Sequence, residues 1–211
     1  MTDTDTTVQN DTAGKNDNAD AAPGDQHPLP VDNRASYTAF AFAFVFGHGA
    51  FAVSTGPDPL LELPGWLPFV LLGLGIVPGV ILALIAAKLA QFGADEASVA
   101  REKLVGTAWG TVFIALTMAI SGMTSTMEMS ADAQAVLWPT GAVFVVGMIN
   151  IAEGAIRRNT LHYSLGSWLT LVGAGALFFS GAGALGVLAV AGGGAYALAA
   201  YLERRRLAKL R

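Results

Sequence analysis

The chain has 211 residues, of which 53% are apolar and only 13% are charged, and its mean hydropathy is positive. Soluble domains carry about twice this share of charge, so the composition excludes an ordinary soluble protein and indicates a membrane protein. The chain contains no cysteine, which excludes disulfides, thiolate metal sites and cysteine nucleophiles.

The first segment, residues 1–33, differs from the rest of the chain in composition. It is rich in Asp, Asn, Thr, Gly and Pro, and seven aspartates lie within residues 1–32. Such a segment buries too little apolar surface to offset the entropy lost on ordering. We therefore predict a disordered, acidic, cytoplasmic tail, which lacks the basic start and apolar core of a cleavable signal peptide.

Six apolar segments follow, and each is long enough to cross a bilayer as a helix. The first contains AFAFAFVFGHGAF, whose alternation would suggest a strand, but both alternating residue types are apolar and the run lacks charge, which favours a membrane helix. Between the last two segments, SGAGALG is a short connection that favours a helical hairpin, because backbone groups in lipid must pair internally. The expected spans are residues 35–55, 65–88, 104–124, 134–156, 163–180 and 183–202.

The sequence thus predicts an all-α integral membrane protein, a six-transmembrane-helix bundle over residues 34–203 with a basic C-terminal segment at 204–211. All twelve basic residues lie in the terminal segments or around the second and fourth connections. The other three connections carry acidic residues and no base. Because Lys and Arg concentrate on the cytoplasmic side of membranes, we expect a multi-pass protein of the cytoplasmic membrane with both termini inside.

His48 is the first candidate functional residue, since an ionisable side chain within a membrane span is costly. Gly47 and Gly49 flank it and would let a neighbouring helix or a ligand approach the imidazole. Three interpretations stay open: a packed hydrogen-bond donor to another helix, which we favour; a ligand, metal or proton site; or a water-exposed residue without a role.

Asn150, Glu153 and Arg157 form the second candidate group, because spacings of three and four residues place them on one helical face. Glu before Arg is the favourable order for a helical pair. We interpret Glu153 and Arg157 as a structural ion pair at the membrane interface. The alternative is a gate or a partner-docking point on the cytoplasmic side that also involves Lys88.

Two stripes of small residues predict close helix packing in the core. One stripe is in the second span and the other is in the third; their members are Gly75, Gly79, Ala83 and Ala87, and Gly106, Gly110, Thr117 and Ser121.

No phosphate-binding loop, HExxH or GxSxG motif is present. We therefore assign no catalytic residue, cofactor or metal, and do not expect an enzyme; an intramembrane enzyme ranks third because His48 and Glu153 are predicted on opposite leaflets. Our primary interpretation is a membrane-embedded interaction subunit or permease-like component, and the alternative is a small-molecule or ion transporter with His48 near its site. The expected partner is the lipid bilayer, without nucleic acid; a cytoplasmic or membrane protein partner and a second copy of the chain are both left open.

Overall fold

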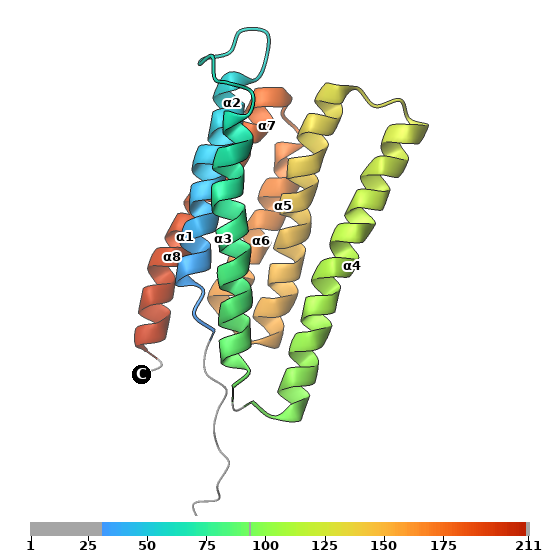
Figure 1. Cartoon of the computed structure of the whole chain (residues 1–211). Helices are drawn as coiled ribbons and strands as arrows, with labels where there is room; N and C mark the ends of the chain where they lie inside the picture. Colours follow the sequence, from blue (N-terminus) through green and yellow to red (C-terminus); the bar gives the residue numbers. More distant parts are fainter. Residues whose placement is uncertain (1–30, 93, 210–211) are drawn as a thin grey trace, which may run out of the picture.

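The computed structural model describes residues 31–92 and 94–209, and all regular structure within this part of the chain is helical (Figure 1). Residues 1–30, which make up most of the predicted tail, lie outside the described residues. The helices, with η marking π-helical segments, are α1 (Arg34–Phe42), η1 (Ala43–His48), α2 (Gly49–Ser54), α3 (Leu67–Ala90), α4 (Glu96–Thr126), α5 (Ala131–Ile156), α6 (Thr160–Ala176), α7 (Gly181–Val187), η2 (Leu188–Gly192) and α8 (Gly193–Ala208).

Five helical segments have the length and apolar composition of a membrane span. They are Arg34–Ser54, Leu67–Leu89, Glu96–Thr126, Ala131–Ile156 and Gly181–Ala208. The first and last are continuous helices that each contain a π-helical stretch. The remaining long helix, α6, has 17 residues and measures about 26 Å at ~1.5 Å per residue, the lower end of what spans a bilayer. The membrane class is therefore supported, while the count of six spans and the orientation remain predictions.

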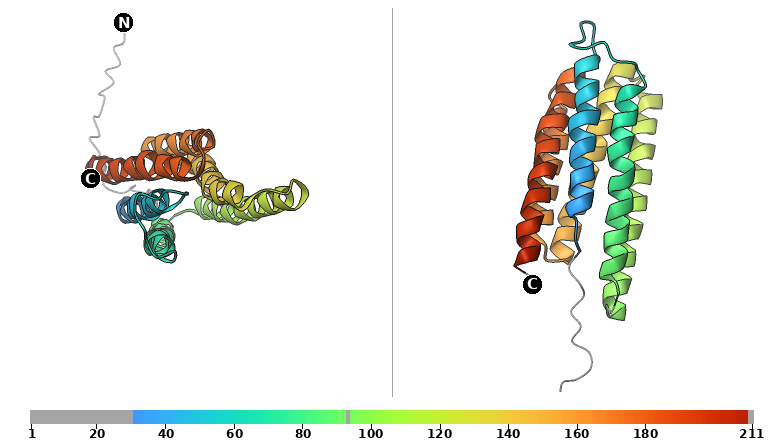
Figure 2. Two further views of the ribbon diagram at one scale, coloured as in Figure 1. Left: turned by 90° about the horizontal axis from the view of Figure 1, so that it is seen from above. Right: turned by 60° about the vertical axis from the view of Figure 1, so that its left-hand side comes forward.

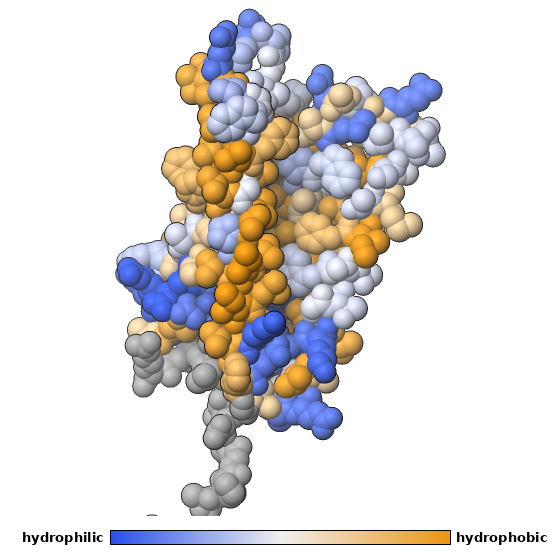
Figure 3. Space-filling view, in the orientation of Figure 1, coloured by the Kyte–Doolittle hydropathy of each residue, from blue (hydrophilic) through white to orange (hydrophobic). Residues whose placement is uncertain are grey.

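The helices form an upright bundle in which α4 lies at one edge (Figures 1 and 2). α1 packs between α3 and α8, α5 packs on α6, and α4 packs on α5. An apolar surface covers the middle of the bundle over α3, whereas the surface over α4 is paler because small and hydroxyl residues interrupt it (Figure 3).

One end of the bundle gathers the basic residues, and we call it the basic end. The start of α1, the end of α3, the start of α4, the α5–α6 turn and the end of α8 all lie there (Figure 1). Its basic side chains are Arg34, Lys88, Arg101, Lys103, Arg157, Arg158, Arg204, Arg205, Arg206 and Lys209. This clustering fits the charge partition of the sequence, since every basic residue among those described lies at this end.

Glycines bring α5 and α6 together at backbone distance. On α5, Gly147 and Gly154 lie seven residues apart, and Gly166 and Gly173 repeat this spacing on α6. A Cβ atom at any of the four would run into backbone atoms of the facing helix. Small residues permit such close helix contacts in membranes, so this hairpin forms the tightest part of the core.

The predicted stripes of small residues have different outcomes. The prediction is confirmed for two members of the α3 stripe: Gly75 packs against Ala39 and Ala43 of the first span, and Gly79 packs against the ring of Phe40. Among the described residues it is wrong for Gly106 and Gly110 of α4, because a Cβ atom at either position would meet no other atom within 4 Å. The helix α4 buries only Val105 and Ile120, and these glycines lie on its exposed side together with large residues such as Ile114.

Candidate functional site

A group of hydrogen-bonded polar side chains lies inside the basic end and joins four helices; we call it the polar cluster. It consists of Tyr37 on α1, Glu102 and Trp109 on α4, Glu153 on α5, His162 on α6, and Arg157 at the end of α5. These groups come from positions up to 125 residues apart in the sequence. The cluster is therefore a product of the tertiary fold.

Glu153 is the centre of the cluster and only 7% of it is exposed. Its Oε1 accepts a hydrogen bond from the indole N–H of Trp109. Its Oε2 lies 3.1 Å from Arg157 Nη1 and 3.2 Å from His162 Nε2. A buried carboxylate is stable only when paired and hydrogen-bonded, and Glu153 meets that condition with three donors.

The α5–α6 turn places Glu153 and His162 opposite each other. α5 ends at Ile156, and Arg158 adopts a positive φ of 50°, which reverses the chain. Asn159 then caps α6, because its side chain accepts a hydrogen bond from the backbone N–H of His162 at 3.1 Å. Gly154 completes the arrangement, since any side chain there would collide with the backbone of Tyr163 on α6.

His162 connects Glu153 to the first helix. Its Nδ1 lies 2.6 Å from the hydroxyl of Tyr37, and the two rings stack with centroids 6.0 Å apart. An ionised carboxylate can only accept, so Nε2 of His162 donates to Glu153; in the tautomer that carries its proton on Nε2, Nδ1 accepts the Tyr37 O–H. This assignment satisfies both ring nitrogens.

Arg157 ties α4 to the cluster. It donates from Nε and Nη2 to the two carboxylate oxygens of Glu102 at 2.9 and 2.6 Å, the bidentate geometry in which arginine binds carboxylates best. Burial disfavours its charge, but the hydrogen bonds with Glu102 and the negative charges of Glu102 and Glu153 outweigh that effect and raise the pKa of Arg157. The guanidinium therefore stays charged and links α4 to α5.

A second buried ion pair lies beside the cluster. Glu203 on α8 is fully buried and accepts two hydrogen bonds from Arg206 at 2.7 Å. The same carboxylate accepts the backbone N–H of Asn33 at 3.3 Å, while Arg206 donates to the carbonyl of Val31. Glu203 and Arg206 thus fasten the start of α1 to the end of α8.

The second predicted group is partly brought together. The ion pair of Glu153 and Arg157 is present as expected. Asn150 is buried one turn deeper, and it is not among the described groups that hydrogen-bond to Glu153. Lys88, the residue of the alternative interpretation, is exposed at the end of α3 and takes no part in the bonds of the cluster.

His48 lies at the end of η1, eleven residues beyond Tyr37 and about 16 Å further along the helix. It is 4% exposed, packs against the ring of Phe44 with centroids 4.8 Å apart, and its Nδ1 has no hydrogen-bond partner among the described residues. Gly47 does admit a neighbour, because Leu72 of α3 lies against it, whereas Gly49 leaves ordinary van der Waals room. His48 and the polar cluster are therefore two separate places in the bundle.

Sequence reasoning missed four members of the cluster, namely Tyr37, Glu102, Trp109 and His162. Only His162 had a usable signal: it follows Glu153 by nine residues across a short connection, so a helical hairpin brings the two close. The other three depend on how α1 and α4 are rotated about their axes.

Comparison with protein families, with curated proteins and with solved structures finds no match in any of the three. The functional argument therefore rests on the geometry of this chain. In the cluster every charged group is engaged by another group of the same chain, an arrangement suited to holding helices together.

Proposed function

We propose that the protein is a membrane-embedded interaction subunit that assembles through the outward face of α4. The observation that carries this proposal is the open small-residue face of α4, where Gly106 and Gly110 have no atoms of the described chain against them. On α5, by contrast, Gly147 and Gly154 are in backbone contact with α6. Glycines at such spacing let a second helix approach closely.

The polar composition of this face supports the same proposal. Thr107, Thr111, Thr117 and Ser121 lie exposed on α4, where they alternate with exposed apolar residues such as Ile114 and Met118. Hydroxyl side chains commonly pack at helix interfaces in membranes. The polar cluster holds the inner part of α4 to the core through Arg157 and Trp109, which keeps the outward face in one orientation.

The partner that this face fits is a transmembrane helix. Gly106 and Gly110 form a G-x-x-x-G pattern, which can pair with a second copy of itself about a two-fold axis. A homodimer through α4 is therefore the simplest assembly, and a helix of another membrane protein is the alternative. We assign no enzymatic activity, cofactor or metal to the chain.

We expect a cysteine at position 110 to form cross-links in native membranes. Because the chain has no cysteine, Gly110→Cys introduces the sole thiol, and a short bifunctional reagent should give a product of twice the monomer mass. The matched control is Leu74→Cys, on α3, where the native side chain is 61% exposed and should face lipid. Electrophoresis under denaturing conditions measures the amount of cross-linked product for both variants.

The masses of the products decide between partners. A product at twice the mass identifies a second copy, and a product of another mass identifies a different membrane protein. If Gly110→Cys and Thr117→Cys give no more product than Leu74→Cys, assembly through α4 is wrong.

A transporter remains the second candidate. The observation that favours it is the buried Nδ1 of His48, which has no hydrogen-bond partner in the part of the chain that the structure describes. Under our proposal, His48→Gln should change the free energy of unfolding by no more than about 1 kcal/mol, the scale of one interhelical hydrogen bond in a membrane. The double variant His48→Gln/Gly110→Cys should still form the cross-link expected from Gly110→Cys alone.

The comparison needs two measurements on His48→Gln: thermal unfolding in detergent and a growth phenotype of cells that depend on the protein. If the variant is stable and supports normal growth, His48 is not part of a functional site. A stable variant that has lost the phenotype favours transport or ligand binding, because an amide does not titrate near neutral pH as imidazole does.

A further inference from the structure

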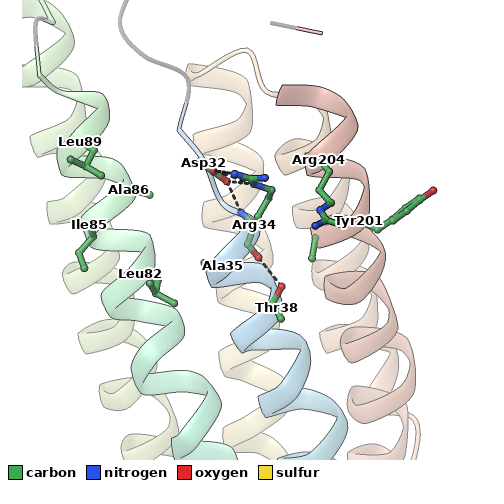
Figure 4. Close-up of a pocket in the computed structure, with 11 residues that line it drawn as sticks. Asp32, Arg34, Ala35, Thr38, Leu82, Ile85, Ala86, Leu89, Tyr201 and Arg204 are labelled. Atoms are coloured by element: carbon green, nitrogen blue, oxygen red, sulfur yellow. Dashed lines mark hydrogen bonds and ion pairs between the residues drawn. The ribbon is translucent and has the colours of Figure 1, made fainter. Parts of the chain in front are cut away.

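A groove of about 780 Å³ runs along the outside of the bundle at its basic end. α1 forms its floor, and α3 and α8 form its two walls (Figure 4). The floor presents Arg34, Ala35 and Thr38, and the walls present Leu82, Ile85, Ala86 and Leu89 from α3 and Ala200, Tyr201 and Arg204 from α8. None of these positions belongs to the polar cluster.

Polar side chains of α1 and α8 face an apolar wall of α3 across the groove (Figure 4). Asp32 precedes α1, Arg34 is the first residue of α1, and Arg204 lies in the last turns of α8. Leu82, Ile85, Ala86 and Leu89 recur at three- and four-residue spacing on one face of α3 and extend toward the middle of the bundle. At about 1.5 Å per residue, this apolar wall is about 10 Å long. A phospholipid combines the same two chemistries, a charged headgroup and an acyl chain that can extend along the α3 wall.

The charges on the polar side of the groove favour an anion. Arg34 and Asp32 neutralise each other through an ion pair of 2.6 Å, and the hydrogen bond from Arg34 lowers the pKa of the Asp32 carboxyl below its ordinary value. Arg204 also lines the groove, and in the described part of the chain it has no ion-pair or hydrogen-bond partner. It lies on the side of α8 toward α1, whereas the ring of Tyr201 extends away (Figure 4).

We propose that this groove binds one anionic phospholipid of the surrounding leaflet, with its phosphate on Arg204 and an acyl chain along α3. Basic pockets between transmembrane helices bind anionic headgroups in this way. The binding site lies on the opposite side of the bundle from the exposed face of α4 and does not depend on assembly through that face.

Native mass spectrometry of the full chain in detergent tests the site. Phosphatidylglycerol should remain bound in preference to phosphatidylcholine with the same acyl chains. Arg204→Gln should weaken phosphatidylglycerol binding about fivefold, the effect of one arginine near a membrane surface. Arg205→Gln is the matched control, because Arg205 does not line the groove and donates instead to the hydroxyl of Tyr201 at 2.8 Å, on a ring that extends away from α1 (Figure 4).

A second variant tests the apolar wall. Ile85→Trp should fill the groove and reduce binding of both lipids, and the fold should tolerate it because Ile85 is 48% exposed. Tryptophan fluorescence melts confirm that each variant is folded. Glycerol phosphate, a headgroup without acyl chains, should not displace the bound lipid.

Three results would each overturn the proposal. Equal losses for Arg204→Gln and Arg205→Gln would show diffuse attraction to a basic surface. Unchanged binding in folded Ile85→Trp would place the lipid elsewhere. Displacement by glycerol phosphate would show a site for small anions.

Discussion

Arg157→Met is expected to lower the free energy of unfolding by about 3 kcal/mol, within the range for removing one partner of a buried ion pair. The substitution leaves Glu102 and Glu153 without their shared cation, and Glu153 is buried. We take the lower part of the range because 16% of the Arg157 side chain still reaches solvent. Chemical or thermal unfolding in detergent, followed by tryptophan fluorescence, measures the loss.

Arg158→Met is the matched control, since it removes the same charge from the neighbouring, exposed position. It should change stability by less than about 0.5 kcal/mol, as surface substitutions usually do. The double variant Arg157→Met/Glu153→Gln should recover part of the loss, because the amide no longer needs a cation. Equal stability of Arg157→Met and Arg158→Met would show that the cluster contributes nothing to holding the helices together.

Gly147→Leu is expected to prevent the α5–α6 hairpin from closing. A Cβ atom at Gly147 would run into the backbone of Thr170, so a leucine must force the two helices apart. Overpacking in a core costs about 1–3 kcal/mol when only side chains must move, and here backbone must move, so we expect the upper value or a complete loss of folded protein. Size-exclusion chromatography and the unfolding midpoint in detergent measure it.

Gly110→Leu is the control, because the same substitution on α4 enters open space. It should leave the unfolding midpoint of the monomer unchanged. In the double variant Gly110→Leu/Thr117→Cys, the leucine should abolish the cross-link expected from Thr117→Cys, which lies on the same face of α4. If Gly147→Leu is as stable as Gly110→Leu, then the close approach of α5 and α6 is not what holds the core together.

Apolar run length was enough to locate the helices. The expected first span at residues 35–55 corresponds to the helix Arg34–Ser54, because absence of charge over twenty residues leaves a membrane helix as the only structure that satisfies its backbone. The start of α4 was missed: the third span was expected at residues 104–124, whereas α4 begins at Glu96. Its first turns are charged, and Asp95 caps them by accepting the N–H of Ser98 at 2.6 Å, a local signal that hydropathy does not register.

The candidate site was predictable only where it depends on one helix. Glu153 and Arg157 are four residues apart, and their pairing follows from helical geometry. The bond from Trp109 to Glu153 could not be predicted in the same way, because it joins positions 44 residues apart and depends on which face of α4 meets α5. The same limit explains the wrong prediction for the α4 stripe. Residue spacing shows that small residues share one face of a helix, but it does not show which helix packs against that face.

The polar cluster and the neighbouring Glu203–Arg206 pair lie at the same end of the molecule. Deeper in the bundle, the indole of Trp168 donates to the carbonyl of Ala191 at 3.0 Å, and Asn150 of α5 hydrogen-bonds to Tyr196 of α8. Away from the basic end, packing supplies most of the contact between the helices, and packing is less directional than a hydrogen bond. Most hydrogen bonds and ion pairs between helices are therefore concentrated at the basic end. We expect helix movements in this protein to grow in amplitude with distance from that end.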